Sequence, residues 1–256
     1  MKRRIITILI TLFLIGQVFA QNVPTSDFSI KMKNYDLSVV LTADSIIDGE
    51  NEKSPRGEIL GFIGDNYQRL QIHFISIIKN QSNPYEYFTY GKTKVKNNIC
   101  EFQGTITIKE AKLYDNRNEV CCDKDTLIKF GYANCEVILY EDRKTNSSGF
   151  IKGNLSSSFL IDLDGVFRYD AYFLVADGFS NNEFTGVWTS YQTGLTKKCN
   201  WGDYRIPESR GLDIGVAVFI ADDKYKDNGW KSYNECDNCN DANCQACKEE
   251  LKKWWK

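Results

Sequence analysis

Apolar and polar residues alternate along much of the chain with the period of two that is typical of β-strands. The runs that show it are 35–47, 57–64, 69–78, 85–95, 100–108, 135–142, 149–163, 166–176, 183–193 and 211–221. Turn-forming pairs such as Asp164-Gly165 and Asp177-Gly178 separate neighbouring runs. The pattern predicts an all-β fold, an antiparallel meander that forms a barrel, with a β-sandwich as the alternative. Only 247–256 has a helical look, and it is short.

Two of these runs share one motif. They read EFQGTIT, centred on Gly104, and EFTGVWT, centred on Gly186. In a strand, each glycine points to the same face as the phenylalanine before it and the apolar residue after it. Glycine there allows the sharp bend that a closed barrel needs. The favoured interpretation is that Phe184 and Trp188 are core residues, and a ligand site is the alternative. If the sheet does close around a ligand, Trp188 is where contact is expected.

Gly186-x-Trp188 is also similar to the strand motif of small up-and-down barrels such as avidins and lipocalins. That resemblance implies a ligand in the mouth or lumen of the barrel. The runs GFIGDNYQR, KNNICEFQGTI and KKCNWGDYRIP resemble uncharacterised secreted proteins of Gram-negative gut bacteria. This second resemblance implies export and a β-rich fold, and it supplies no activity.

The N-terminus has the features of a secretory signal peptide. A basic start, MKRR, precedes the apolar run IITILITLFLIG, and Val18 and Ala20 form a small-residue cleavage site. The apolar run is too short for a transmembrane helix, which needs about 20 residues. We therefore expect cleavage near Ala20 and a secreted or periplasmic product. The expected organisation is a signal peptide over 1–20, a β domain over 21–233 and a Cys-rich tail with a short helix over 234–256.

Composition narrows the class of partner. Three of the 32 basic residues lie in the leader, which leaves 29 basic against 34 acidic side chains. This mild negative charge gives no reason to expect nucleic acid as a partner. No later apolar run is long enough for a transmembrane segment. The expected partner is an unknown small molecule, glycan or protein.

The cysteines of an exported chain are expected to form disulfides. There are nine, so at least one is unpaired within the chain: Cys100, Cys121, Cys122, Cys135, Cys199, Cys236, Cys239, Cys244 and Cys247. Cys100 and Cys135 are the expected partners of the adjacent pair Cys121 and Cys122. The last four cysteines form a C-x2-C-x4-C-x2-C tail. A disulfide-stapled tail is favoured, with zinc bound by these four residues as the alternative and a redox pair less favoured. No other cofactor or metal is expected.

Catalytic signatures are sparse. His73 is the one histidine. It lies in an alternating run, which places its side chain on the other face of the strand from Ile72 and Phe74. No Gly-x-Ser-x-Gly elbow accompanies it, so a serine-hydrolase triad is disfavoured. Two carboxylate pairs, Asp162 with Asp164 and Asp222 with Asp223, keep a glycan-active hydrolase as an alternative. Acidic residues are also ordinary in turns.

Aromatic residues beside polar ones supply the candidate ligand contacts. These are Trp188 and Tyr191 after the second motif, and Trp201, Asp203, Tyr204 and Arg205 within KKCNWGDYRIP. The competing interpretation of that run is a loop tied down by Cys199, with Trp201 packed against the end of the barrel.

Three functions remain open. The favoured one is an exported, non-enzymatic binding or interaction protein, which predicts an apolar pocket near Trp188 that also contains polar groups. The alternatives are the hydrolase and a structural or surface protein without a ligand pocket. A packed aromatic core beside Gly104 and Gly186 would exclude binding in the lumen.

Overall fold

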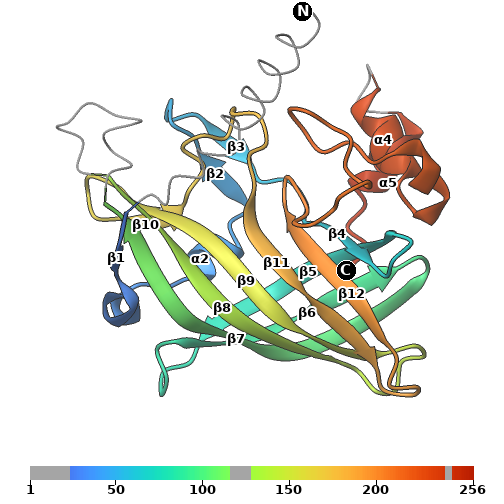
Figure 1. The fold of residues 1–256 in the computed structure, drawn as a ribbon, viewed down its shortest axis with the longest axis horizontal. Coiled ribbons are helices and arrows are strands. Elements are labelled where there is room, and N and C mark those ends of the chain that lie inside the picture. The colour runs from blue at the N-terminus through green and yellow to red at the C-terminus, as the bar shows by residue number, and fades with distance from the viewer. Residues whose placement is uncertain (1–23, 116–127, 240–243) are drawn as a thin grey trace, which may run out of the picture.

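Eight antiparallel strands close into a barrel, as predicted (Figure 1). The computed structural model describes residues 24–115, 128–239 and 244–256. The barrel strands are β4 (Leu60–Ile63), β5 (Gln68–Lys79), β6 (Glu86–Val95), β7 (Asn98–Tyr114), β8 (Lys129–Glu141), β9 (Gly149–Ile161), β11 (Asn181–Ser190) and β12 (Thr196–Asp203). Each strand pairs with the next along this series, and β12 pairs with β4, so that Cys199 lies opposite Ile63. This last pairing closes the sheet and leaves no free edge.

Short elements cover one end of the barrel, which we call the plugged end. They are β1 (Thr25–Asp27), η1 (Ser29–Asn34), α2 (Ser38–Leu41), the hairpin of β2 (Ser45–Ile47) and β3 (Lys53–Pro55), and β10 (Phe167–Tyr169). The prediction of one strand over 35–47 was wrong. Leu37, Val40 and Leu41 are buried together, at the i, i+3, i+4 spacing of a helix rather than the i, i+2 spacing of a strand. The hydroxyl of Tyr87 on β6 accepts a 2.9 Å hydrogen bond from the backbone N–H of Leu37, which anchors the plug.

Aromatic and aliphatic side chains fill the barrel interior. Phe102, Ile106 and Phe184 are completely or almost completely buried. The ring of Phe184 stacks on Trp201 of β12 with centroids 3.6 Å apart. Side chains therefore fill the barrel interior beside Gly104 and Gly186.

Both motif glycines lie where the chain packs too closely for a side chain. A Cβ on Gly104 would overlap the carbonyl oxygen of Ile138 on β8. A Cβ on Gly186 would overlap the Lys152 carbonyl and the ring of Phe184. Gly186 also lies directly opposite Gly153 of β9. These glycines therefore let neighbouring strands and one aromatic ring come together.

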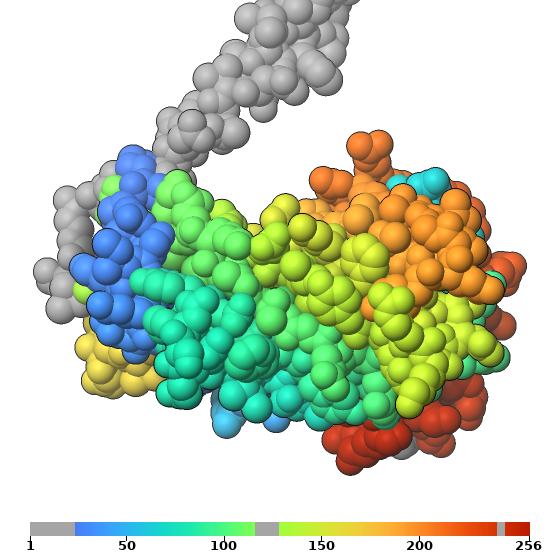
Figure 2. All heavy atoms as spheres, turned by 90° about the horizontal axis from the view of Figure 1, so that it is seen from below, coloured from blue at the N-terminus to red at the C-terminus, as the bar shows by residue number. Residues whose placement is uncertain are grey.

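A second, smaller core, which we call the outer core, lies outside the barrel. Leu60 and Phe62 point outward from β4 and pack against residues from the C-terminal fifth of the chain, namely Ile206, Leu212, Phe219, Ala221 and Trp230. The helices there are η2 (Asp223–Asn228), α4 (Lys231–Asp237) and α5 (Gln245–Glu250). Figure 2 shows this segment in red, at the opposite end of the molecule from the N-terminal elements in blue. The expected boundary between 233 and 234 falls inside α4.

Two further strand predictions were wrong. The run 211–221 forms a loop, because Leu212, Phe219 and Ala221 enter the outer core while the residues between them turn away from it. In the run 166–176 only the three residues of β10 form a strand. Alternation alone did not distinguish these segments from barrel strands.

Arg69 of β5 fastens the C-terminal segment to the barrel wall. Its guanidinium donates two hydrogen bonds to Glu250, of 2.8 and 2.6 Å, and lies over the ring of Trp230. Farther along β5, the outward-facing His73 stacks on Trp255 with centroids 3.8 Å apart. The single histidine is thus a packing residue on the outer wall, on the face opposite to Ile72, as its position in the run predicted.

Candidate functional site

A pocket of about 650 Å³ opens at the end of the barrel opposite the plug, and we call it the mouth pocket. Inward-facing side chains form its wall, among them Thr93, Cys100, Glu141, Ile151 and Trp188. The hairpins that join the barrel strands contribute Asp65, Asn66, Lys96, Ser147 and Lys197. The volume lies within the range of small-molecule sites. An apolar wall with polar groups beside Trp188 is the pocket that the binding hypothesis predicted.

The carboxylate of Glu141 is the most constrained polar group of the mouth pocket. Its oxygen Oε1 accepts a hydrogen bond from Thr93 Oγ1 at 2.5 Å. Its oxygen Oε2 accepts from the Gly149 backbone N–H at 2.8 Å and from Trp188 Nε1 at 2.9 Å. Donors from β6, β9 and β11 therefore hold one side chain of β8 in a single orientation.

Glu141 is buried, with 6% of its surface exposed, yet it has no cationic partner among the described residues. Buried carboxylates are normally paired with a cation, because desolvating the charge is costly. Hydrogen bonds offset part of that cost. With one accepted hydrogen bond, Oε1 keeps a lone pair for a further donor. The mouth pocket thus presents an oriented anion.

The rim of the mouth pocket is basic. Lys197 places its ammonium 5.8 Å from the centre of the Trp188 ring, and Lys96 is exposed. Lys198 is already paired with Glu208 at 2.6 Å. The entrance therefore combines two lysines that are unpaired among the described residues, Lys96 and Lys197, with one exposed acid, Asp65, while Glu141 lies at the wall.

Cys100, which also lines the mouth pocket, is not a suitable nucleophile. Burial and, to a smaller extent, the negative charge of Glu141 together raise the pKa of its thiol to about 12. The thiolate is the reactive form of cysteine. At neutral pH this residue acts as a small apolar wall group.

The prediction that Cys100 and Cys135 form disulfides was wrong, and Cys199 is also a free thiol. All three side chains occupy inward positions of barrel strands and are buried. Their expected partners, Cys121 and Cys122, lie outside the described residues.

The disulfide-stapled tail is confirmed. Cys236 bonds to Cys247, and Cys239 bonds to Cys244. The sulfurs of Cys239, Cys244 and Cys247 lie within 4.8 Å of one another, which is close enough for a shared metal ion. Zinc binds cysteine as thiolate, however, and these sulfurs are held as disulfides.

The predicted ligand residues lie in different parts of the fold. Trp188 is in the mouth pocket. Tyr191 follows β11 and does not line that pocket; the guanidinium of Arg143 covers its ring at 3.9 Å. Trp201 is in the packed interior. Trp201 lies in the strand β12, so the loop interpretation was wrong for this residue.

Asp203 lies in a buried polar cluster at the plugged end. Its oxygen Oδ2 accepts hydrogen bonds from Tyr169 at 3.1 Å and Asn182 at 2.7 Å, and Arg56 lies 3.5 Å away. Burial raises the pKa of its carboxyl above the ordinary value, against the lowering effect of Arg56. The cluster ties β11 and β12 to the segment that follows β3, which gives Asp203 a structural role.

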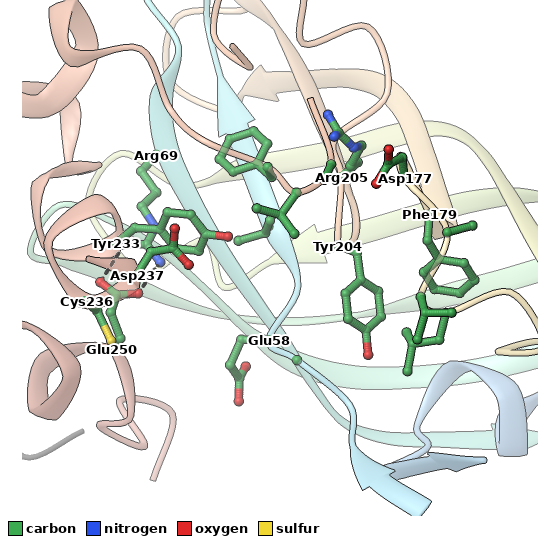
Figure 3. Close-up of a pocket in the computed structure, with 18 of the residues that line it drawn as sticks. Glu58, Arg69, Asp177, Phe179, Tyr204, Arg205, Tyr233, Cys236, Asp237 and Glu250 are labelled. Carbon is green, nitrogen blue, oxygen red and sulfur yellow. Dashed lines mark hydrogen bonds and ion pairs between the residues drawn. The ribbon is translucent and has the colours of Figure 1, made fainter. Parts of the chain in front are cut away.

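Tyr204 and Arg205 line a separate pocket of about 520 Å³ on the outer wall of the barrel (Figure 3), which we call the outer pocket. The guanidinium of Arg205 is already occupied, since it pairs with Asp213 at 2.5 Å and donates to the carbonyl of Val216 at 2.7 Å. Arg205 therefore fixes a loop.

Sequence reasoning missed Glu141 and Thr93. The alternation of β8 contains the signal for Glu141. Every second residue from Cys135 to Leu139 points inward, and Glu141 is the next residue in that series. An acid at an inward position of a strand is the feature to search for. Thr93 carries no comparable signal, since threonine is common on both faces of strands.

No helix in the described part of the chain is long and apolar enough to cross a membrane. Comparison with protein-family models, with curated proteins and with solved structures found no match to the chain. The function must therefore be argued from the pockets and the residues that line them.

Proposed function

We propose that the protein is an exported, non-enzymatic binding protein that holds a small polar molecule in the mouth pocket. An ammonium or hydroxyl group of the ligand donates to Glu141. The observation that carries the proposal is the buried carboxylate of Glu141, which is oriented by three donors and lacks a cation among the described residues.

The remaining groups of the pocket support a polar ligand. Thr93 and Asn98 supply further hydrogen-bonding atoms near Glu141, while Ile151 and Trp188 supply apolar surface. Lys96 and Lys197 at the entrance suit an acceptor or a negative charge at the outer end of the ligand. Ligand sites typically combine an apolar wall with a few such fixed polar groups.

The carboxylate pairs of the hydrolase alternative serve local structure. Asp162 accepts hydrogen bonds from the backbone N–H groups of Asp164 and Val166 in the turn after β9. Asp222 caps η2 by accepting from the N–H of Lys224 at 3.0 Å. Neither pair lines the mouth pocket or the outer pocket. This supports binding as the function. The remaining alternative, a structural or surface protein without a ligand pocket, has no comparable observation in its favour.

The test is a titration of the purified mature protein with a panel of amino acids, alkyl diamines and monosaccharides, followed by calorimetry. Glu141→Gln keeps the shape of the side chain and removes its charge. Glu136→Gln is the matched control, because Glu136 lies on the same strand but faces outward. We expect Glu141→Gln to weaken binding roughly 10- to 100-fold, the value of a hydrogen bond to a charged group.

Glu136→Gln should bind like the wild type. Circular dichroism shows whether each variant is folded. The proposal is overturned if no compound of the panel binds, or if folded Glu141→Gln binds as tightly as the control.

A further inference from the structure

The outer pocket lies where several segments of the chain meet on the outside of the barrel. The start of β4, the loops 174–179 and 213–220, and the helices α4 and α5 enclose it (Figure 3). Its floor is apolar and largely aromatic, with Leu60, Phe179, Tyr204, Phe219 and Tyr233. The mouth pocket shares none of these residues. The two are therefore independent sites.

Apolar side chains at the rim of the outer pocket are exposed to solvent. Val175 is 88% exposed, Leu251 is 73% exposed and Val218 is 58% exposed, and all three line the pocket. Contiguous exposed apolar surface around a concave site is characteristic of binding sites. The outer core accounts for Phe219 but leaves these three side chains without a packing role.

The two apolar loops of the rim are held in place. The backbone N–H of Gly178 donates to the carbonyl of Ala217 at 3.1 Å and joins one loop to the other. Arg205 donates to the carbonyls of Gly215 and Val216 at 3.2 and 2.7 Å. The apolar rim is thus a fixed feature of the fold, and a fixed site loses little entropy when it binds.

Uncompensated negative charge surrounds this apolar floor. Glu58, Asp177 and Asp237 line the pocket at separate points around it (Figure 3). Among the described residues, none of the three makes a side-chain hydrogen bond, and the one ionisable partner within 4 Å is His73, 3.9 Å from Glu58. The two arginines of the pocket are already paired, Arg69 with Glu250 and Arg205 with Asp213. The charge left for a ligand is therefore negative.

We propose that the outer pocket binds a small cationic amphiphile, a molecule with one apolar chain or ring and a positively charged head. The apolar part lies on the aromatic floor between Val175, Val218 and Leu251. The head lies toward the carboxylates of Glu58, Asp177 and Asp237. A volume of about 520 Å³ is that of a small-molecule site.

Three probes of equal chain length test the proposal: octylammonium, octanoate and octanol, each titrated into the full mature protein by calorimetry below its aggregation concentration. We expect octylammonium to bind and octanoate to bind at least tenfold more weakly. Octanol, which has the chain but no charge, should fall between them.

Matched variants locate the site. Glu58→Gln/Asp177→Asn should reduce the preference for octylammonium over octanoate roughly tenfold, as two partly exposed charges contribute. Glu50→Gln/Glu52→Gln makes the same change of charge in the exposed turn between β2 and β3 and should leave the preference unchanged. Ala217→Trp should block all three probes, because it fills the pocket from an exposed position. Repeating the titrations in Glu141→Gln removes the carboxylate of the mouth pocket, so that the preference that remains belongs to the outer pocket.

The proposal is overturned if the three probes bind equally, if none binds, or if the carboxylate variants retain the full preference. A basic apolar peptide that binds at the pocket where octylammonium does not would also overturn it, and would identify a protein segment as the occupant.

Discussion

The indole nitrogen of Trp188 donates a 2.9 Å hydrogen bond to the carboxylate of Glu141. The bond joins β11 to β8 across the intervening strand β9, at the end of the barrel that has no plug. One side chain of the recurring motif therefore orients the acid of the mouth pocket. This relationship links the stability of the open end to the ligand binding that is proposed for it.

Trp188→Phe retains an aromatic ring in the wall but removes this donor. Glu141 then keeps only Thr93 and Gly149 as donors. We expect a loss of about 1–3 kcal/mol in the free energy of unfolding, because a buried charged acceptor loses a hydrogen bond. Urea denaturation measures it. Trp254→Phe is the control, since Trp254 is half-buried near the C-terminus and should lose less than about 1 kcal/mol. Equal losses in the two variants would contradict the assigned role of the bond.

The two motif glycines should be intolerant of any side chain. Gly104→Ala places a Cβ against the Ile138 carbonyl and the Cα of Leu139, both of which are backbone atoms that cannot rotate away. We expect a destabilisation of about 3 kcal/mol, the upper part of the range for overpacked sites. Thermal unfolding of Gly104→Ala and Gly186→Ala checks this. At Gly211 the nearest atom to a new Cβ is the flexible end of Lys224, so Gly211→Ala is the control.

The barrel was predictable because most of its strands alternate. In β7 and β8 the inward positions, such as Phe102 and Val137, are apolar and the outward ones are mostly polar. β12 was missed for a physical reason. Its outward face is also buried, because Asn200 and Gly202 lie beneath the segment around Pro207. A strand covered on both faces has no alternation to detect.

The candidate site was predictable at one residue. Trp188 was identified, yet the group that gives the pocket its chemistry is Glu141, 47 positions away. An acid at the end of a strand can point into the barrel or toward solvent. Which of the two occurs depends on its place in the alternation of inward and outward residues, and on the hairpin that follows. The outer pocket could not be anticipated, because it is assembled from segments as distant as Glu58 and Leu251.

The three buried thiols should resist alkylation in the folded protein. Burial raises the pKa of Cys100 and of Cys135 to about 12 and raises the pKa of Cys199 as well. At pH 8 almost none of the thiolate form exists. We expect iodoacetamide to leave all three unmodified in the native state and to modify them fully in denaturant without reductant. Peptide mass mapping reads each site separately, and native-state modification of Cys135 would contradict the inward placement of this residue.

The same experiment tests the tail. Cys236, Cys239, Cys244 and Cys247 should react only after reduction, and non-reduced peptides should show the pairs Cys236–Cys247 and Cys239–Cys244. Replacing Cys236 and Cys247 by serine opens a loop of 11 positions, for which a loss of about 3 kcal/mol is expected. Because this loop lies in the C-terminal segment outside the barrel, we expect the tail to loosen while the barrel stays folded. Four free thiols with bound zinc in the unreduced protein would instead support the metal alternative.

Docking of the C-terminal segment should weaken in acid. Burial on its own would raise the pKa of Glu250, but the hydrogen bonds and the charge of Arg69 outweigh it, and the pKa lies below the ordinary value of 4.5. A carboxyl group with a lowered pKa in the folded state stabilises that state above its unfolded pKa. The stabilisation is therefore complete above about pH 5 and is lost as the pH falls through the folded pKa. Acrylamide quenching of tryptophan fluorescence follows this, since Trp230, Trp254 and Trp255 all lie in the segment.

Glu250→Gln isolates this contribution from other titrating acids. It removes the charge that Arg69 binds, so quenching at pH 7 should already approach the value that the wild type reaches in acid once Glu250 is protonated, with a loss of about 1–2 kcal/mol in docking. Glu249→Gln changes the preceding residue, whose carboxylate contacts only Gln245, and should follow the wild type at every pH. If Glu250→Gln retains the wild-type pH profile, then Arg69 and Glu250 do not control the attachment, and the packing of Trp230 and Trp255 on the barrel wall must hold the segment without them.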